Sequence, residues 1–398
     1  MVLVSLDPSG ALATQRFSRG IAVAHALAWA DMEPTSSTQF VSAPFAHEGR
    51  SLAREELAQL RRIGFDFVRL AIDPGPFLQF KGPNRDGLDA ILMDHVRKIL
   101  SSGLSVIVDF HPSDLNPLYT SEALTAGVGT PVFQAYLDLL GRTAALLAVV
   151  EPGRVALEIM NEPTVGTNAW QPMLVAGYEA IRARAPTLPV IVSGGDEGSA
   201  EGLMQIAPRV FGADAAVLYS FHFYDPYQFT HQGANWNPAR FLANVPYPAD
   251  ARPLEESITA TLDAIEASQL PRTAMRDAHA DALKRLGSYR SSRFGRETVA
   301  RTFDRIAKWA QLHGIPANRI LMGEFGAVRT QRQLTEPGAS ERQRWFRDVR
   351  EEAERRGFGW AVWVYRGSGG FALAQPEAGT PIDSAILAAL GLAAQPRD

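Results

Sequence analysis

The chain has 398 residues, of which 46% are hydrophobic and 21% charged, as in an ordinary globular protein with a large core. Its net charge of −4 provides neither a basic surface for nucleic acid nor a polybasic patch for a membrane. The sequence contains no cysteine, which excludes thiol catalysis, disulfides and zinc–thiolate sites. No apolar run reaches the length of about 18 residues that a membrane span needs, so no span is predicted.

Short apolar segments alternate along the chain with longer segments of helical period. Most of the short segments are apolar on both faces, as expected of parallel strands that are covered on both sides. We predict eight strands, at residues 19–25, 65–72, 104–111, 154–161, 188–195, 216–223, 319–325 and 358–365. Among the helices between them, Ser51 is predicted to cap the first, and Thr130 with Pro131 to open one that reaches about Leu147.

Eight strands that are each followed by a helical segment predict an α/β protein with a (β/α)8 TIM barrel. A doubly wound open sheet is the alternative, but no GxGxxG motif follows the first strand. The distance from 223 to 325 is 102 residues, much longer than the other gaps, so we expect an insertion at 225–290 between strands 6 and 7, with a long loop and extra helix. Because no linker divides the chain, we predict a single catalytic domain over 1–398.

Polar residues gather at the C-terminal ends of the predicted strands, where a barrel of this kind carries its active site. Burying such groups costs free energy unless they pair, so we expect a network around a cleft. The residues at or just beyond these ends are His25, Trp29, Arg69, Asp73, Asp109, His111, Asn161, Glu162, Asp196, Glu197, His222, Tyr224, Asp225, Glu324, Trp363 and Tyr365.

Among the acids in this set, Glu162 on strand 4 and Glu324 on strand 7 lie on nearly opposite strands. Cleavage of a glycosidic bond needs such a pair, with one acid protonated to donate to the leaving oxygen and the other ionised. Glu158, four residues before Glu162, is expected to be structural and to lie at the far end of the barrel.

The sequence resembles glycoside hydrolase family 5, in the clan of retaining (β/α)8 glycosidases, through motifs that run along most of the chain. The matching elements are RGI at 19–21, Arg69 in FVRLAI, His111 in VIVDFH, the triplet Asn161–Glu162–Pro163, His222 and Tyr224 in SFHFY, Glu324 in GEFG, and Trp363 in WAVW. Each motif alone is weak, but their order and barrel spacing make the combination specific.

The resemblance implies a role for each matching residue. Glu162 would be the general acid/base and Glu324 the nucleophile, with carboxyl groups about 5–5.5 Å apart as in retaining enzymes. Arg69 and Tyr224 would hydrogen-bond Glu324 and hold it ionised, and His222 would help to set the protonation of Glu162.

Three further residues would bind the sugar according to the same resemblance. Asn161 would bind the 2-hydroxyl, His111 the sugar at the bond being cut, and Trp363 would stack on the ring. His25, Trp29 and, in the loop at 225–248, Trp236 are candidate substrate contacts, with the ordering of loops as the alternative role.

A divalent metal held by Asp109, His111, His222 and Glu324 is an alternative, but barrel metallohydrolases usually carry an HxH motif on the first strand, which here has a single histidine. Asp109 shares a face with His111 and is expected to be its partner. We therefore predict no metal and no cofactor.

The predicted function is that of a retaining hydrolase of β-linked glucan, an endo-β-1,4-glucanase. A β-mannanase or an exo-acting β-glucosidase or β-glucanase is the alternative within the class, because the insertion could block one end of the cleft. A non-catalytic carbohydrate-binding barrel is the alternative of another class. The predicted partner is a β-linked polysaccharide or oligosaccharide, with a monomer favoured.

The resemblance favours a secreted or periplasmic protein. The first twenty residues, however, lack the basic segment and long apolar run of a signal peptide. A removed leader and a cytoplasmic location therefore both stay open.

Overall fold

The eight predicted strands are all present in the computed structural model, which describes residues 17–329, 339–367, 370–375 and 380–393. They are parallel and follow one another in chain order around a closed barrel. Their bounds are β1 Arg19–Leu27, β2 Phe67–Ile72, β3 Ser105–Phe110, β4 Val155–Glu158, β5 Val190–Ser193, β6 Val217–Phe223, β7 Ile320–Phe325 and β8 Gly359–Val362. The prediction of a (β/α)8 barrel is thereby confirmed.

The chain divides into two compact units. Unit 1 comprises residues up to 222, 309–323 and 357–361, and therefore holds all of β1 to β5 and most of β6, β7 and β8. Unit 2 comprises 223–308, 324–356 and 362 onwards. The single catalytic domain over 1–398 stays a prediction.

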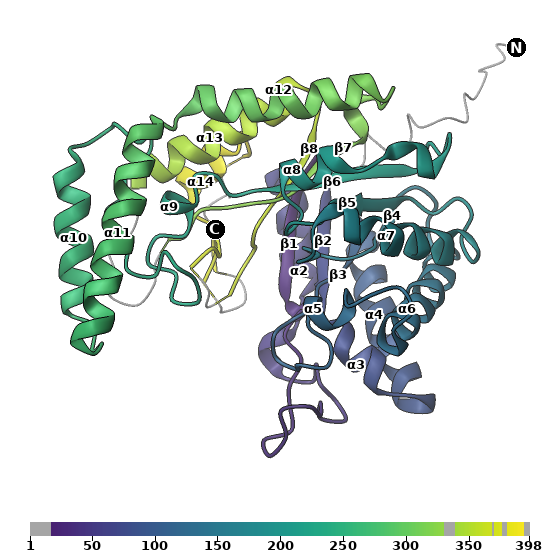
Figure 1. The fold of residues 1–398 in the computed structure, drawn as a ribbon. Coiled ribbons are helices and arrows are strands. Elements are labelled where there is room, and N and C mark those ends of the chain that lie inside the picture. The colour runs from purple at the N-terminus through teal and green to yellow at the C-terminus, as the bar shows by residue number, and fades with distance from the viewer. Residues whose placement is uncertain (1–16, 330–338, 368–369, 376–379, 394–398) are drawn as a thin grey trace, which may run out of the picture. The chain divides into compact units, whose positions relative to one another are not determined.

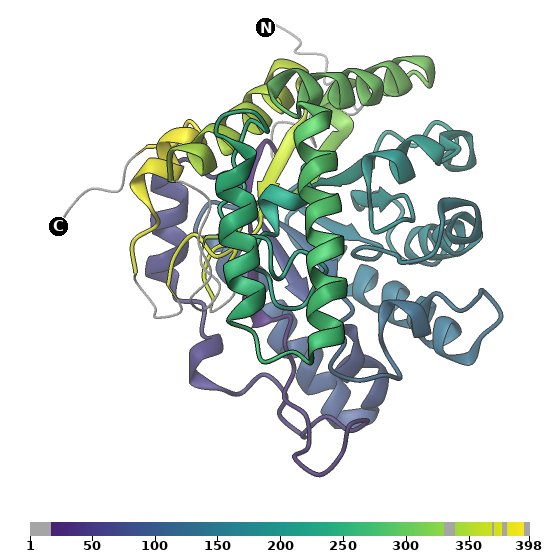
Figure 2. The same ribbon diagram turned by 60° about the vertical axis from the view of Figure 1, so that its left-hand side comes forward.

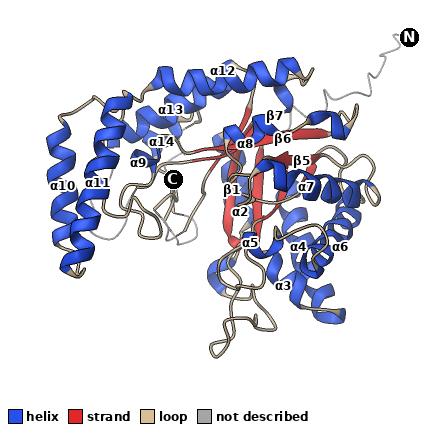
Figure 3. Cartoon of the chain, in the orientation of Figure 1, coloured by secondary structure: helices blue, strands red, loops and turns tan. Residues whose placement is uncertain are grey.

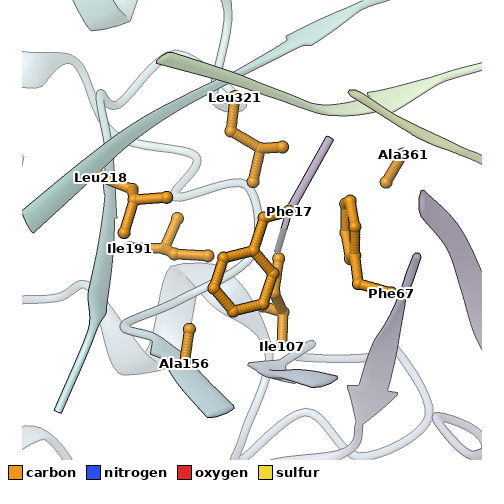
Figure 4. Packing of buried hydrophobic residues seen from close by; sticks show 8 residues of the cluster. All are labelled: Phe17, Phe67, Ile107, Ala156, Ile191, Leu218, Leu321 and Ala361. Atoms are coloured by element: carbon orange, nitrogen blue, oxygen red, sulfur yellow. The ribbon is translucent and has the colours of Figure 1, made fainter. Parts of the chain in front are cut away.

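The interior of the barrel in unit 1 is filled by apolar side chains that come from successive strands. Figure 4 shows the cluster, which consists of Phe17, Phe67, Ile107, Ala156, Ile191, Leu218, Leu321 and Ala361. β1 contributes no side chain at this level, because Gly20 faces the ring of Phe67 and a Cβ there would lie only 2.2 Å from it. Phe17, just before β1, fills the space instead and meets Phe67 edge to face at 5.5 Å.

Seven α-helices accompany the first five βα steps in unit 1, and α4, α6 and α7 run along the outside of the strands (Figure 1 and Figure 3). They are α2 Arg54–Ile63, α3 Pro74–Gln79, α4 Gly82–Ser101, α5 Ser121–Leu124, α6 Pro131–Leu147, α7 Thr167–Arg182 and α8 Ala200–Gln205. The short 3-10 helices are η1 Glu48–Arg50, η2 Pro208–Phe211 and η3 Ala317–Arg319.

Two helix caps test the local predictions. Thr130 caps α6 as predicted, with its hydroxyl accepting from the backbone N–H of Phe133 and Pro131 at the first helical position. The Ser51 cap is wrong, because α2 begins later, after Ala53. The Glu56 carboxylate accepts from the Ala53 N–H and so satisfies a donor at that helix end without a side-chain cap at Ala53.

The insertion after β6 is present, but it contains more than one extra helix. α9 Tyr227–Thr230 is followed by a loop and then by α10 Leu254–Glu266 and α11 Arg272–Ser292. α10 and α11 lie side by side in two views (Figure 1 and Figure 2), and the chain turns between them before Pro271. The extra helix expected within the insertion at 225–290 is therefore a helical hairpin.

The remaining helices are α12 Arg296–Leu312, whose last residues belong to unit 1, and α13 Ala339–Arg355 and α14 Ser384–Ala389 in unit 2. α13 and α14 contact each other. Of the helices in the described ranges, none combines the length and the apolarity that crossing a bilayer requires.

We predict that Phe67→Ala lowers the free energy of unfolding by about 3–5 kcal/mol, because the missing ring leaves a cavity between Gly20 and Phe17. Val149→Ala is the matched control, since Val149 is 82% exposed and its truncation should change stability by less than about 0.5 kcal/mol. Denaturant unfolding followed by circular dichroism measures both, and equal midpoints for the two variants would contradict this account of the core.

Candidate active site

A buried ion pair joins β2 to β4 in unit 1. The side chain of Arg69 is 0% exposed, and it binds the Glu158 carboxylate through two bonds, from Nε to Oε2 at 2.8 Å and from Nη2 to Oε1 at 3.0 Å. Asp109 on β3 adds a second carboxylate, with its Oδ2 3.1 Å from Arg69 Nη2. A buried guanidinium is tolerable only when it is paired in this way.

The placement of Glu158 corrects the sequence-based expectation. Glu158 is the last residue of β4 and lies beside Asp109 in the strand register, so it belongs to the polar network and not to the far end of the barrel. The expectation was wrong because β4 was predicted to continue to Asn161, whereas it ends three residues earlier. The sequence does hold a signal for this pairing: one acid, Glu158, stands in an apolar strand, and one arginine, Arg69, stands in another.

The same guanidinium begins a chain of hydrogen bonds towards His111. Arg69 Nη2 donates to Asn161 Oδ1 at 2.9 Å, and Asn161 Nδ2 lies 3.4 Å from His111 Nε2. His111 Nδ1 lies 3.0 Å from Asp109 Oδ2, which is the contact expected between these two residues. With the proton on Nδ1, facing the carboxylate, Nε2 can accept from the Asn161 amide.

The charge on Asp109 is held by its neighbours. Burial alone would raise the pKa of Asp109, but Arg69 and the hydrogen bond from His111 outweigh it and bring that pKa below its ordinary value. Because the guanidinium already sits beside this carboxylate, a divalent metal at the same place is disfavoured.

Glu162 follows β4 in a left-handed backbone conformation, with φ of 42°. This conformation is uncommon for a residue that has a Cβ and must be held by its surroundings. The Ser121 hydroxyl donates to the Glu162 carbonyl at 3.2 Å, and the backbone N–H of Glu197 donates to the carbonyl of Pro163 at 3.0 Å. The loop after β5 thus clamps the loop that carries Glu162.

The Glu162 side chain is paired with a histidine from β6. His222 Nδ1 lies 2.8 Å from Glu162 Oε1, and the carboxylate side chain keeps 35% of its surface exposed. Gly198 packs against both residues and accepts from the His222 backbone N–H at 2.8 Å. Because Gly198 has φ of +67°, glycine is favoured where the backbone approaches this pair.

Burial raises the pKa of Glu162, and the electrostatic interactions with His111 and Arg69 oppose that shift only in part. The carboxyl group therefore keeps its proton to a higher pH than an ordinary glutamate. Glu197, in the neighbouring loop, also has a raised pKa, caused first by burial and then by the charge of Glu162.

Two substrate candidates come from the region of β1. Trp29 is 45% exposed, and its ring meets the His111 ring edge to face at 6.4 Å. His25 lies within β1 and is partly buried. Trp29 is therefore in contact with the polar network, which fits the predicted role of a sugar contact.

Unit 2 carries Glu324, the second of the two acids that the sequence predicts to be catalytic. Glu324, on β7, is 3% exposed, and the Tyr224 hydroxyl donates to its Oε2 at 2.8 Å, as predicted. The Thr230 hydroxyl donates to the Tyr224 carbonyl at 2.6 Å and ties α9 to this tyrosine. The contact between Arg69 and Glu324 stays a prediction.

Trp363 directly follows β8, and its backbone N–H donates to the Phe325 carbonyl at 2.9 Å. Its side chain is partly exposed, and the peptide bond to Val364 is cis. Trp236, in the loop after α9, is 58% exposed and contacts Phe371 with ring centroids 6.3 Å apart. Both tryptophans therefore offer an accessible indole in unit 2.

The comparisons with known proteins agree with this fold. Residues 34–369 match the family model described as Cellulase (glycosyl hydrolase family 5). Endoglucanase C of Acetivibrio thermocellus is 24% identical over 221 residues, which cover 53% of this chain and 62% of that protein. Endoglucanase 3 of Fibrobacter succinogenes is 23% identical over 343 residues, 80% of this chain and 46% of that protein. The match thus spans less than two thirds of either relative.

Among solved structures, the cellulose synthase subunit Z of Clostridioides difficile has a TM-score of 0.66 at 19% identity, covering 94% of this chain and 99% of that one. Thermotoga maritima Cel5A in complex with cellobiose has a TM-score of 0.65 at 19% identity, covering 95% and 98%. The same Cel5A is also described with mannotriose, at 18% identity, with a TM-score of 0.65 and coverage of 95% and 98%. At these identities the likeness supports the barrel fold.

We predict that Glu158→Ala lowers the free energy of unfolding by about 3–5 kcal/mol, because it leaves the buried Arg69 without its two-bond partner. Glu151→Ala is the matched control: Glu151 also pairs with an arginine, but its side chain is 51% exposed, so the loss should stay below about 1 kcal/mol. Denaturant unfolding of both variants is the measurement, and a Glu158→Ala variant as stable as the control would refute the anchoring role.

Proposed function

The chain belongs to glycosyl hydrolase family 5, and from that membership we propose that it is a retaining glycoside hydrolase acting on β-linked glucan, as an endo-β-1,4-glucanase. The observation that carries the proposal is a pair of contacts, Glu162 with His222 and Glu324 with Tyr224. They supply each of two strand-end acids with the kind of neighbour that its proposed role requires.

In the first step, Glu324 attacks the anomeric carbon with a carboxylate oxygen. The bond from that carbon to the leaving oxygen breaks, and the proton of Glu162 passes to the leaving oxygen. In the second step, Glu162 takes a proton from water, the resulting hydroxide attacks the anomeric carbon, and Glu324 departs as a carboxylate. Two displacements restore both side chains and retain the configuration of the sugar.

The surroundings of the two acids support this division of roles. The raised pKa of Glu162 favours a protonated group before the first step. The hydrogen bond from Tyr224 to Oε2 orients the Glu324 carboxylate for attack. We propose that Arg69 also binds Glu324, and that the carboxyl groups of the two acids lie about 5–5.5 Å apart.

The substrate contacts follow from the network in unit 1. We propose that Asn161, fixed by Arg69, binds the 2-hydroxyl, where the contact strengthens in the transition state. His111, held by Asp109, is proposed to bind the sugar at the bond being cut, with Trp29 beside it. Trp363 is proposed as the stacking platform for the sugar face. His25, on β1, is the last of the proposed substrate contacts.

Glucan and mannan are not separated by these contacts, because the two polymers differ in the orientation of one hydroxyl. A β-mannanase or an exo-acting β-glucosidase or β-glucanase is therefore the second candidate, and the description of one barrel neighbour with both cellobiose and mannotriose agrees with keeping it. A non-catalytic carbohydrate-binding barrel is disfavoured, because both glutamates are present. The proposal includes a secreted or periplasmic location, where such polymers occur.

The substrate is tested with a panel of β-glucans and β-mannans whose product lengths are measured over time. An endo-β-1,4-glucanase releases mixed oligomers from cellulose-type polymers early in the reaction. A single short product from the chain end would instead establish the exo-acting alternative, and turnover of mannan alone would establish a mannanase.

We predict that Glu162→Gln and Glu324→Gln each lower kcat on an aryl β-glycoside by at least about 100-fold, because each removes a group that acts in the transition state. Asp138→Asn, at an exposed acid on α6, is the control and should keep parental activity. A 2-fluoro sugar should form an adduct on Glu324 that mass spectrometry detects. Product of inverted configuration would overturn the mechanism.

We predict that the alkaline limb of the kcat/KM profile reports Glu162. The acid is active when protonated, so activity is present below its pKa and is lost as the pH rises through that pKa, which lies above the ordinary glutamate value of 4.5. A pH series on an aryl β-glycoside measures the limb. If Glu162→Gln keeps the same limb in its residual activity, another group is responsible.

A further inference from the structure

Exposed aromatic side chains are few in the part of the chain that the structure describes. Among its exposed large hydrophobic residues, three are aromatic: Trp29, Tyr227 and Trp236. Single exposed apolar residues are ordinary on protein surfaces. These three are distinctive because ring contacts join each of them to the candidate active site, and Tyr227 and Trp236 do so within unit 2.

The ring of Trp236 is linked to Glu324 by a short path. Trp236 contacts Phe371 at 6.3 Å between ring centroids, and Phe371 contacts Tyr224 edge to face at 5.6 Å. Tyr224 in turn donates to Glu324. A single buried ring, Phe371, thus separates the exposed indole from the tyrosine that orients the proposed nucleophile.

His231 packs against three of the aromatic rings near Trp236. It stacks on Tyr227 at 3.9 Å and meets Tyr224 and Phe371 at 5.2 Å and 4.9 Å. Burial lowers the pKa of His231 to about 3, so the imidazole is neutral at physiological pH. A neutral ring packs among aromatic rings without the cost of a buried charge.

A pocket of about 320 Å³ opens beside Trp236, between the loop after α9 and helix α11. This volume falls at the small end of the range for small-molecule sites, about 300–1,000 Å³. Its wall includes the residues Asn235, Trp236, Asn237, Arg240, Asp281 and Ala282. All of them belong to the insertion between β6 and α12, the region that Figure 2 shows with its two long helices.

The chemistry of the wall suits an uncharged ligand that carries several hydroxyl groups. Arg240 donates hydrogen bonds, Asp281 accepts them and the Asn235 amide does both. The Arg240 guanidinium lies 4.8 Å from the centre of the Phe241 ring, and Asp281 Oδ2 accepts a hydrogen bond of 2.6 Å from Arg285 Nε. One positive and one negative side chain leave the wall without net charge, so a phosphate or carboxylate ligand gains little there.

We propose that this pocket is a sugar-binding subsite, in which the indole of Trp236 stacks on one pyranose of a β-linked chain while another part of the same chain reaches Glu324. An indole presents a flat apolar face that matches the C–H face of the sugar, and the polar side chains of the wall bind its hydroxyls. The inference rests on the proposed function and gives the insertion a role: it lengthens the binding path, so that longer oligosaccharides bind more tightly.

The test compares Trp236→Ala with Leu283→Ala on an aryl β-cellobioside and on cello-oligosaccharides of increasing length. Leu283 is 42% exposed on α11, next to Ala282 but outside the pocket wall. For Trp236→Ala we expect a loss in kcat/KM that grows with chain length and reaches about five- to tenfold, through KM, on the longest oligosaccharides relative to the short aryl substrate. Leu283→Ala should match the parent throughout.

If the parent hydrolyses oligosaccharides and Trp236→Ala keeps the parental dependence on chain length, the subsite is refuted while the proposed function stands. If the parent hydrolyses no β-glucan or β-mannan, the proposed function fails, and affinity electrophoresis in a soluble β-glucan gel judges the pocket separately. Retardation of the parent that is lost in Trp236→Ala supports the subsite, and equal migration of the two proteins refutes it.

Discussion

The buried charge of Arg69 is the constraint on which the polar part of unit 1 depends. A guanidinium with no exposed surface must have carboxylates beside it, and Glu158 and Asp109 provide them from the next two strands. The same group then donates to Asn161 and fixes the orientation of its amide. These contacts fix the orientations of the Arg69 and Asn161 side chains before any ligand binds.

Beneath this network the interior of the barrel is apolar, and the contrast between the two layers has a physical reason. The interior cluster from Phe17 to Ala361 has no polar atoms in its side chains, so it contributes burial of apolar area and shape. A polar side chain within the apolar cluster would have no hydrogen-bonding partner among its neighbours. Above the cluster, Arg69 on β2 finds such partners in Glu158 on β4 and Asp109 on β3.

The loop with Glu162 shows how tertiary contacts hold a backbone in a conformation that its own residue disfavours. Ser121 binds the Glu162 carbonyl, and the turn after β5 binds the loop just beyond it, so three segments far apart in the sequence share this task. The result is a carboxyl group beside His222 with a raised pKa. In unit 2, Tyr224 donates to Glu324 and is itself packed against the rings of His231 and Phe371.

The sequence by itself determined the elements whose signal is local. Apolar runs on both faces predicted all eight strands, and Thr130 with Pro131 predicted the start of α6, because these patterns act through neighbouring residues. The tertiary structure alone decided that Glu158 anchors Arg69, 89 positions away, and that Glu162 adopts a left-handed backbone. Partners so distant depend on strand register and loop packing, which arise only when the whole barrel closes.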